Sequence, residues 1–527
     1  MSNTHSTSSG QSFAMPLKTT VLGIVPLVTI AVAAGSGTLL DPVQAVLLPD
    51  AALAKNPLGH LGANGPWSAG PNVFGISSDV PDNCYVDQAA YVSRHGSRYP
   101  DSGAYSGWVK MAKLFKESNY TATGPLSFFH TWETPLTNPS IQIAQVSKTG
   151  YKELFDMGYT LRMRYPDLYQ EGEPFYVWAN NYTRVLQTAQ LFLHGYLGTN
   201  SSLGTVVSVT GKNMPAHLGD TLAPSDMCPS FVDSSDAQQT TWRGHWLPAF
   251  KARLSQYIEG TLELDDSTWA DFPYVCGFES QITGRLSPFC DTFTQEELSQ
   301  YEYQQDLRYY YGVGPAADVA SKMMVPFLDA LIQRFTSGPD AKGTGFDGKA
   351  FTVPKLLMSF LNDGQLNELA VATGAFDKQK SLPLDHIPED RLWRSSYISP
   401  MRGTIAFERL NCLGQTSSPN STTPTPTASC RSRSTHAARL TQRNSATNET
   451  YVRIRINDAV YPVPSCQDGP GKSCKVSKYA KYLAEKLEAN GNFASICNTT
   501  DPATPTKVLG ASFFTNLAQA HLSPVKP

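Results

Sequence analysis

Three segments of the chain share one order of parts: an apolar run typical of a buried strand, a polar turn, and then an amphipathic helix. The strands and their turns occur in "CYVDQAAYVSRHG", "PFYVWANNYTRVLQTAQLFLHGYLG" and "FTVPKLLMSFLNDGQLNELAVATGAF". Such units place strands side by side with helices on their faces, so they predict an α/β fold with a mixed or mainly parallel central sheet. Ligands of open α/β sheets bind beyond the carboxyl ends of the strands, which makes the three polar turns the candidate site.

The first turn, "YVSRHGSRYP", places one histidine between two arginines. No acidic residue occurs between Asp87 and Asp101, so Arg94 and Arg98 have no local ion partner. Arginine stays charged and matches phosphate oxygens with paired N–H donors. Neighbouring cations should keep His95 neutral, and a neutral imidazole nitrogen can attack phosphorus. The turn therefore predicts phosphoryl transfer to His95.

The other two turns supply the rest of the predicted site. Arg184 lies in the first turn of a helix, where free N–H groups and the helix dipole favour an anion. Asp363 is the predicted proton donor, with a pKa raised by burial and nearby negative charge. Alternatively, Asp363 and Asn362 only cap the next helix, since Asn362 and Gln365 have capping-box spacing. No metal or other cofactor is required, because the arginines supply the positive charge.

"RHGSRYP" resembles the RHGxRxP signature of the histidine acid phosphatases, which include fungal phytases and secreted acid phosphatases. The similarity extends from about Asn72 to about Cys497 and includes "EYQQDLRYYYGVGP" and "ISPMRGTIAFERLNC". It implies a large α/β domain, a smaller mostly α-helical domain, and an active site in the cleft between them. It also implies hydrolysis of phosphate monoesters through a phosphohistidine.

The resemblance assigns a role to each residue of the candidate site. It implies the nucleophile His95, the proton donor Asp363 and the phosphate-binding residues Arg94, Arg98, Arg184 and Asn362. Asn362 departs from the family, which has a histidine before the aspartate. An asparagine amide can donate to phosphate but adds no positive charge at acidic pH, so phosphate binding is expected to be weaker.

The domain organisation follows from shifts in composition along the chain. The expected parts are 1–45 as signal peptide or anchor, 46–235 as the first α/β part, 236–337 as a mostly α-helical subdomain, 338–412 as the second α/β part, 413–449 as a disordered insert, and 450–527 as the C-terminal α/β part. In the helical subdomain, the tyrosines of "RYYYG" are interpreted as packing between domains. The Ser/Thr/Pro-rich insert is either a glycosylated loop or translated intron sequence.

The N-terminal region predicts export. Residues 21–34, "VLGIVPLVTIAVAA", are typical of a signal peptide, and a retained membrane anchor is the alternative. No other stretch is apolar enough to cross a bilayer, so no stable membrane association is expected after cleavage. The predicted localisation is extracellular or the cell wall. The sequons for N-glycosylation are Asn119, Asn181, Asn200, Asn420, Asn448 and Asn498.

Nine cysteines in an exported chain predict four disulfides and one unpaired thiol, for which Cys430 in the insert is the candidate. Proximity in sequence suggests two bridges, Cys276 with Cys290 and Cys466 with Cys474. The resemblance suggests the other two, Cys84 with Cys412 and Cys228 with Cys497.

The formal net charge of −3 and the absence of a long basic tract argue against a nucleic-acid partner. The predicted substrate is a small-molecule phosphate monoester or phytate, acted on by a secreted acid phosphatase. The alternative is a catalytically weak or inactive phosphate-binding relative, which is supported by Asn362 alone. The oligomeric state is left open.

Overall fold

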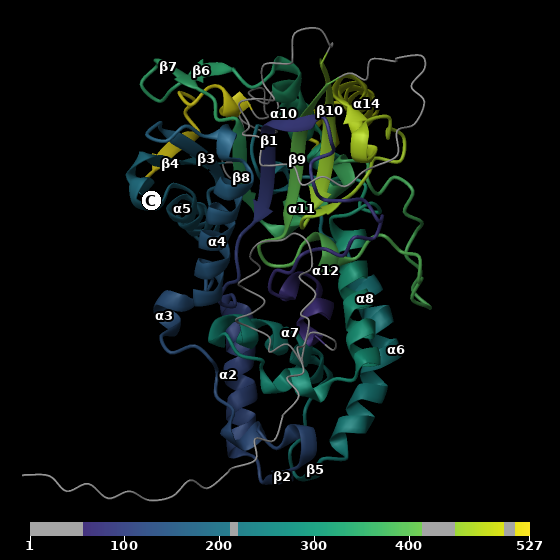
Figure 1. Cartoon of the computed structure of the whole chain (residues 1–527). Helices are drawn as coiled ribbons and strands as arrows, with labels where there is room; N and C mark the ends of the chain where they lie inside the picture. The colour runs from purple at the N-terminus through teal and green to yellow at the C-terminus, as the bar shows by residue number, and fades with distance from the viewer. Residues whose placement is uncertain (1–55, 211–219, 414–447, 500–511) are drawn as a thin grey trace, which may run out of the picture. The chain divides into compact units, whose positions relative to one another are not determined.

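The computed structural model describes residues 56–210, 220–413, 448–499 and 512–527. The predicted signal segment and nearly all of the predicted insert, with Cys430, lie outside these residues. A nine-stranded sheet forms the centre, in the order β11-β10-β9-β1-β8-β3-β4-β13 with β12 beside β10 (Figure 1). Its strands are β1 (Cys84–Arg94), β3 (Phe175–Asn180), β4 (Gly204–Val209), β8 (Leu356–Leu361), β9 (Thr404–Leu413), β10 (Asn448–Ile456), β11 (Ala459–Val460), β12 (Cys474–Lys475) and β13 (Leu522–Val525).

The sheet is mixed, as the sequence predicted. Strands β1, β8, β3 and β4 run parallel to one another, whereas β9, β10 and β13 pair with their neighbours in antiparallel fashion. The described ends of the predicted insert are adjacent, because Leu413 of β9 pairs with Asn448 of β10. The insert thus joins two neighbouring antiparallel strands.

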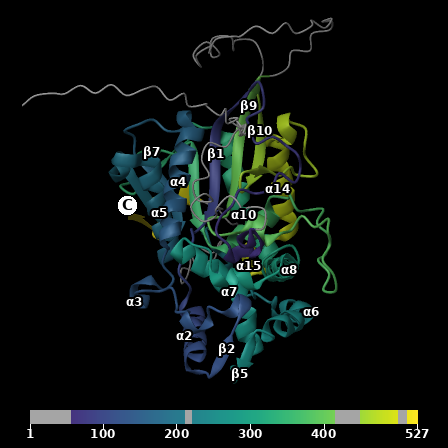
Figure 2. The same ribbon diagram turned by 60° about the horizontal axis from the view of Figure 1, so that its bottom comes forward.

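Strand β1 is buried on both faces, which explains its long apolar run. Ala89 and Tyr91 belong to the apolar cluster formed with α4 (Lys148–Arg164) and α5 (Thr183–Leu197). Ala90 and Val92 belong to the cluster that includes α10 (Val325–Ser337) and α14 (Val476–Asn490). This alternation is the two-residue period of a strand between two helical layers (Figure 2).

Helices α5 and α11 (Asp363–Ala372) directly follow the second and third polar turns, in agreement with the predicted pattern. After the first turn, helix α2 (Ser102–Glu117) comes before the predicted helix α4, and the sequence pattern missed it. Ser147 caps α4 by accepting from Gly150 N–H, and α4 ends just before Pro166. Helix α5 ends at Gly198, whose φ of 57° suits glycine.

Further helices pack beyond the carboxyl ends of the central strands. They include α2 (Ser102–Glu117), α6 (Asp236–Ser255), α7 (Asp266–Thr283) and α8 (Gln295–Gly312). Trp108 of α2 contacts Tyr274 and Phe278 of α7 edge to face. A capping box between Thr294 and Glu297 starts α8, whose last turn reaches the candidate site. The domain boundaries inferred from the sequence stay a prediction.

Shorter elements complete the described structure. The helices are α3 (Pro139–Gln142), α9 (Ala320–Met323), α12 (Ser395–Ile398) and α15 (Phe493–Ile496). The strands form two small sheets, β2 (Tyr120–Ala122) with β5 (Ile258–Gly260) and β6 (Lys342–Thr344) with β7 (Ala350–Thr352).

The four predicted disulfides are all present. They join Cys84 to Cys412, Cys228 to Cys497, Cys276 to Cys290 and Cys466 to Cys474. Five of the predicted glycosylation sites are described and exposed, namely Asn119, Asn181, Asn200, Asn448 and Asn498. Among the described helices, none is long and apolar enough to span a membrane.

Candidate active site

The three polar turns meet at one edge of the sheet. Arg94, the last residue of β1, is in register with Leu361, the last residue of β8, and the His95 N–H donates to the Leu361 carbonyl oxygen at 3.0 Å. His95 and Asn362 therefore lie at adjacent strand ends. Strand β3, on the other side of β8, leads through a short turn to Arg184 in the first turn of α5.

Helix α4 holds the loop after β1 in place. A Cβ atom on Gly96 would lie 2.2 Å from Leu154, and one on Gly150 would lie 2.1 Å from the Ser97 carbonyl oxygen, so this approach requires both glycines. The Ser97 N–H and hydroxyl each donate to the buried Glu153 carboxylate at 2.7 Å. These contacts fix the backbone directly after His95.

His95 is completely buried, and its ring has one defined hydrogen bond. Its Nδ1 lies 2.9 Å from the Gly96 carbonyl oxygen, an acceptor, so Nδ1 carries the hydrogen and Nε2 has a free lone pair. Nε2 has no hydrogen-bond partner among the described residues. Burial, followed by Arg94, Arg184 and Arg98, holds the pKa of His95 well below its ordinary value. The imidazole is neutral, as the sequence indicated.

Three arginines surround this imidazole, and each is only partly hydrogen-bonded. Arg94 Nη1 donates to two carbonyl oxygens at 2.5 and 2.8 Å, Arg98 Nη1 donates to one at 2.9 Å, and Arg184 Nη2 donates to Asn362 Oδ1 at 2.9 Å. The Nε of each arginine is buried without a hydrogen-bond partner in the described structure. Burial and Arg98 lower the pKa of Arg184 to about 10, a sign of crowded positive charge.

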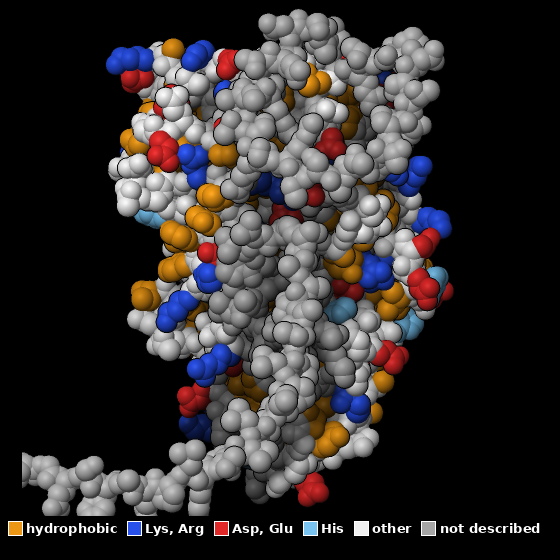
Figure 3. All heavy atoms as spheres, viewed as in Figure 1, with side chains coloured by type: hydrophobic (Ala, Val, Ile, Leu, Met, Phe, Trp, Pro, Cys, Tyr) orange, Lys and Arg blue, Asp and Glu red, His pale blue; other side chains and the backbone are white. Residues whose placement is uncertain are grey.

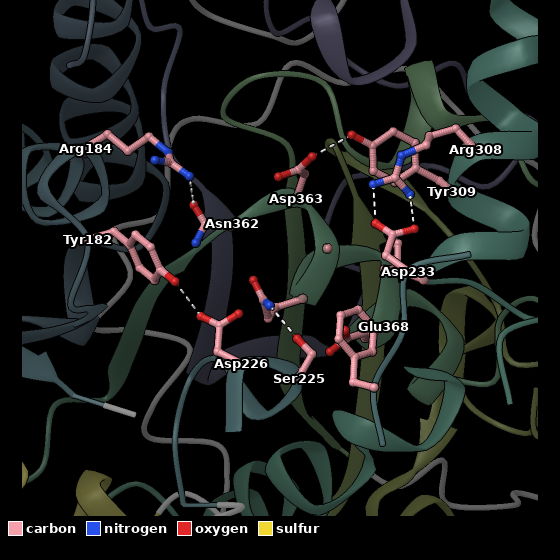
Figure 4. A pocket seen from close by; sticks show the side chains of 14 residues that line it. Tyr182, Arg184, Ser225, Asp226, Asp233, Arg308, Tyr309, Asn362, Asp363 and Glu368 are labelled. Atoms are coloured by element: carbon pink, nitrogen blue, oxygen red, sulfur yellow. Dashed lines mark hydrogen bonds and ion pairs between the residues drawn. The ribbon is translucent and has the colours of Figure 1, made fainter. Parts of the chain in front are cut away.

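Asn362 takes the N-cap position of α11 but makes no side-chain capping bond. Its oxygen accepts from Arg184, which leaves its amide nitrogen free to donate (Figure 4). Gln365, the other residue of the proposed capping box, donates instead to Ser225 Oγ at 2.7 Å. The capping-box alternative for Asn362 is therefore wrong.

Asp363 lies beside the arginines, with its Oδ2 3.7 Å from Arg94 Nη2, and it accepts a hydrogen bond from the Tyr309 hydroxyl. Burial alone raises the pKa of Asp363, but Arg94, the Tyr309 hydroxyl and His95 together hold it well below its ordinary value. The rise in pKa expected from burial is therefore outweighed by the neighbouring arginines and the Tyr309 hydroxyl.

A cavity of about 260 Å³ opens beside Asp363. It is lined by the start of α5, the turn η9 (Pro224–Met227), residues 231–233, the end of α8 and the start of α11. The labelled side chains of Figure 4 surround this space, and their pairs include Arg308 with Asp233 and Tyr182 with Asp226. The cavity is large enough for an alcohol group attached to a phosphate bound near His95.

Sequence reasoning missed the contribution of α8. Within "RYYYG", Tyr310 packs edge to face on Trp393, as expected for packing. Tyr309 instead donates to Asp363, and Arg308 forms an ion pair with Asp233. No local pattern separates these neighbours, because which tyrosine faces the site depends on how α8 is rotated against α11. Ser225, Asp226, Asp233 and Glu368 were missed for the same reason.

Comparison with known proteins tests the family assignment. Residues 85–457 match the family model of the histidine phosphatase superfamily (branch 2). The chain belongs to this superfamily. The match confirms the family that the motif indicated and, with it, the prediction of a histidine acid phosphatase.

Relatives of this histidine phosphatase include acid phosphatases and phytases. It is 29% identical over 471 residues to an acid phosphatase of Komagataella pastoris, covering 87% of this chain and 90% of the relative. It is 27% identical over 461 residues to a phytase of Candida albicans, covering 86% and 89%. The crystal structure of the D. castellii phytase shares the fold, with a TM-score of 0.73, 23% identity, and coverage of 89% of this chain and 94% of that one.

Proposed function

We propose that the protein is a secreted acid phosphatase that hydrolyses phosphate monoesters, with phytate as a candidate substrate, through a covalent phosphohistidine on His95. The observation that carries the proposal is the bare, buried Nε2 of His95 among three arginines whose Nε donors have no partner. An arrangement of unpaired cationic donors around a nucleophile suits a phosphate group.

In the proposed reaction, Arg94, Arg98 and Arg184 bind the phosphate oxygens and His95 Nε2 attacks phosphorus. The bond from phosphorus to the ester oxygen breaks, and Asp363 gives its proton to that oxygen. Water then attacks the phosphohistidine and loses a proton to Asp363, and the products are orthophosphate and free His95. The Asn362 amide nitrogen donates a further hydrogen bond to the phosphate.

Asp363 must be protonated for the first step. A bound phosphate brings negative charge next to Asp363 and offsets the arginines, so it raises the pKa of the carboxyl from this low value. We expect activity to require mildly acidic solution. A rate that rises steadily from about pH 5 to about pH 8 would contradict a protonated Asp363.

Export is part of the proposal. Four disulfides support an oxidising compartment, and the exposed sequons are accessible to glycosylation in the secretory route. The site of action is then extracellular or the cell wall.

A second candidate function is phosphate binding without efficient turnover. It is favoured by one feature, the uncharged Asn362 next to an ionised Asp363. A free nucleophile and a carboxyl group in reach of the same arginines favour catalysis instead, because a binding protein needs neither.

The test is phosphate release from phenyl phosphate and from phytate across acidic pH, for the secreted protein and for His95→Ala. Release by the wild type that disappears in a folded His95→Ala variant supports the phosphatase. A phosphohistidine trapped by acid quenching of the wild type, and absent from the variant, supports the covalent step. A folded wild type that binds phosphate but releases none from either ester would favour the binding protein.

A further inference from the structure

Glu368 lies at the floor of the active-site cavity, five residues after Asp363 on α11 (Figure 4). Its side chain is fully buried, and neither carboxyl oxygen has a hydrogen bond of acceptable geometry to any described residue. The pKa of Glu368 is raised to about 8. Burial is the main cause, Asp226 and Asp233 add to the rise, and a contact with the Ser225 hydroxyl partly offsets it. In acidic solution the group is thus a neutral carboxylic acid with an O–H to donate.

Most other polar groups of the cavity are already paired. Arg308 binds Asp233, Tyr182 donates to Asp226, and Tyr309 donates to Asp363. At the floor, Gln365 Nε2 donates to Ser225 Oγ, but Gln365 Oε1 is buried without a partner, like the carboxyl of Glu368. A buried polar group without a partner is costly and uncommon in folded proteins, so two such groups in one cavity call for an explanation.

A hydroxyl group of a bound substrate would satisfy both residues, since it accepts from the Glu368 O–H and donates to Gln365 Oε1. We propose that Glu368, Gln365 and Ser225 form a subsite for a hydroxyl group of the substrate's alcohol half, so that the cavity selects monophosphates of hydroxyl-bearing alcohols such as polyols and sugars. The inference rests on the proposed phosphatase function. Five helical residues place Glu368 about 7.5 Å along the axis from Asp363, within reach of one ring-sized alcohol.

The charges of the cavity favour a hydroxyl over a second phosphate at this subsite. Asp226 and Asp233 line the same cavity as Glu368, and a second phosphate would face these acids. Of the described lining residues, the cations are Arg184, which belongs to the phosphate site, and Arg308, which Asp233 neutralises. A hydroxyl group needs no such charge.

The test compares three substrates: glycerol 2-phosphate, which carries hydroxyls, phenyl phosphate, which carries none, and phytate. Glu368→Met removes the donor at similar size and should raise KM for glycerol 2-phosphate about two- to tenfold, the worth of one hydrogen bond, with KM for phenyl phosphate and both kcat values unchanged. Glu368→Gln keeps a neutral donor and should restore the wild-type KM. The matched control is Glu279→Gln, which alters another buried glutamate, bound by Ser287 outside the cavity, and should leave the ratio of the KM values unchanged.

An equal change for glycerol 2-phosphate and phenyl phosphate, or a Glu368→Gln variant as impaired as Glu368→Met, would overturn the subsite. A larger loss for phytate than for glycerol 2-phosphate would also overturn it, in favour of a second phosphate site. If Glu368→Met does not fold, Ser225→Ala serves instead, with the same selective rise expected. A wild type that is inactive on all three substrates would overturn the proposed function itself. An active wild type, with variants that leave the ratio of KM for glycerol 2-phosphate to KM for phenyl phosphate unchanged, would overturn the subsite alone.

Discussion

Two buried clusters of arginines lie on the same sheet and differ in how they are paired. In the first, here called the structural cluster, Arg164, Arg453 and Arg455 surround Glu408 in the middle of β9. Their Nε atoms donate to a tyrosine hydroxyl, a carboxylate oxygen and a carbonyl oxygen, at 2.9, 2.7 and 3.2 Å. Burial raises the pKa of Glu408, but Arg455, Arg453 and Arg164 lower it to about 2.

In the second, here called the phosphate cluster, Arg94, Arg98 and Arg184 surround His95 at the strand ends. All three Nε atoms are buried without a partner among the described residues. The carboxylate beside them is that of Asp363, whose Oδ2 lies 3.7 Å from Arg94 Nη2. Burying an unpaired charged donor is costly, and the proposed phosphate would supply the missing acceptors. The two clusters have the same number of arginines. The hydrogen bonds of their Nε atoms are what separates the proposed phosphate site from the structural network.

The largest expected effect is a loss of folding stability when the carboxylate of the structural cluster is removed. Glu408→Gln removes the buried carboxylate shared by Arg453, Arg455 and the partly buried Arg164, and should lower the free energy of unfolding by about 3–5 kcal/mol at neutral pH. Because the folded pKa of Glu408 is about 2, this stabilisation is present above the ordinary glutamate pKa and lost as pH falls toward 2. Urea unfolding at pH 7 and at acidic pH checks both points. A neutral-pH loss below about 1 kcal/mol would contradict a structural role for Glu408.

The reverse pattern is expected in the phosphate cluster. Arg184→Met should lower kcat/KM for phenyl phosphate about 10²–10³-fold, because a donor to the transferring phosphate is lost. Its free energy of unfolding should stay equal or rise, since the variant relieves the crowding of Arg184 by Arg98 and Arg94. Steady-state kinetics and urea unfolding on one preparation measure both, with Glu408→Gln as the control that loses stability but keeps its activity per folded molecule. An Arg184→Met variant that is destabilised but has normal kinetics would show that Arg184 is structural, like the arginines around Glu408.

A smaller effect concerns acid stability. The folded pKa of His95 lies well below its unfolded value, so the unfolded chain binds the extra proton and wild-type stability falls as pH drops below about 6.5. His95→Ala removes this proton-binding group. Below that pH, the difference in free energy of unfolding between variant and wild type should shift in favour of the variant by about 1.4 kcal/mol per pH unit. Unfolding free energies at pH 7.5 and 5.5 provide the comparison. A folded His95→Ala variant with the same pH dependence as the wild type would contradict a buried, neutral His95.

The smallest expected effect comes from Asn362, which is joined to the phosphate cluster by Arg184. Asn362→His supplies a cation at acidic pH and should lower KM for phenyl phosphate about two- to fivefold, since a charged donor binds phosphate more strongly than an amide. Asn362→Gln keeps an amide and should show no such gain. Turnover by Asn362→His that is no better at any subsaturating substrate concentration would show that Asn362 does not limit phosphate binding.

The sequence by itself determined the parts that depend on neighbouring residues. The motif around His95 and the second and third strand, turn and helix units follow from local spacing and hydrophobic period. Proximity in sequence suggested the disulfides Cys276–Cys290 and Cys466–Cys474, but only the structure settled them. The grouping of Arg184 and Asp363 with His95 also followed, because parallel strands bring their carboxyl ends to one edge.

Only the tertiary structure decided which atoms remain unpaired and which groups are ionised. Tyr309 reaches Asp363 because the last turn of α8 lies beside the start of α11, and Glu368 is buried next to Ser225 of η9. Asp363 is ionised because Arg94 and the Tyr309 hydroxyl outweigh its burial. The pKa and the hydrogen bonds of each group depend on several residues that are far apart in the sequence. A local sequence pattern therefore does not predict them.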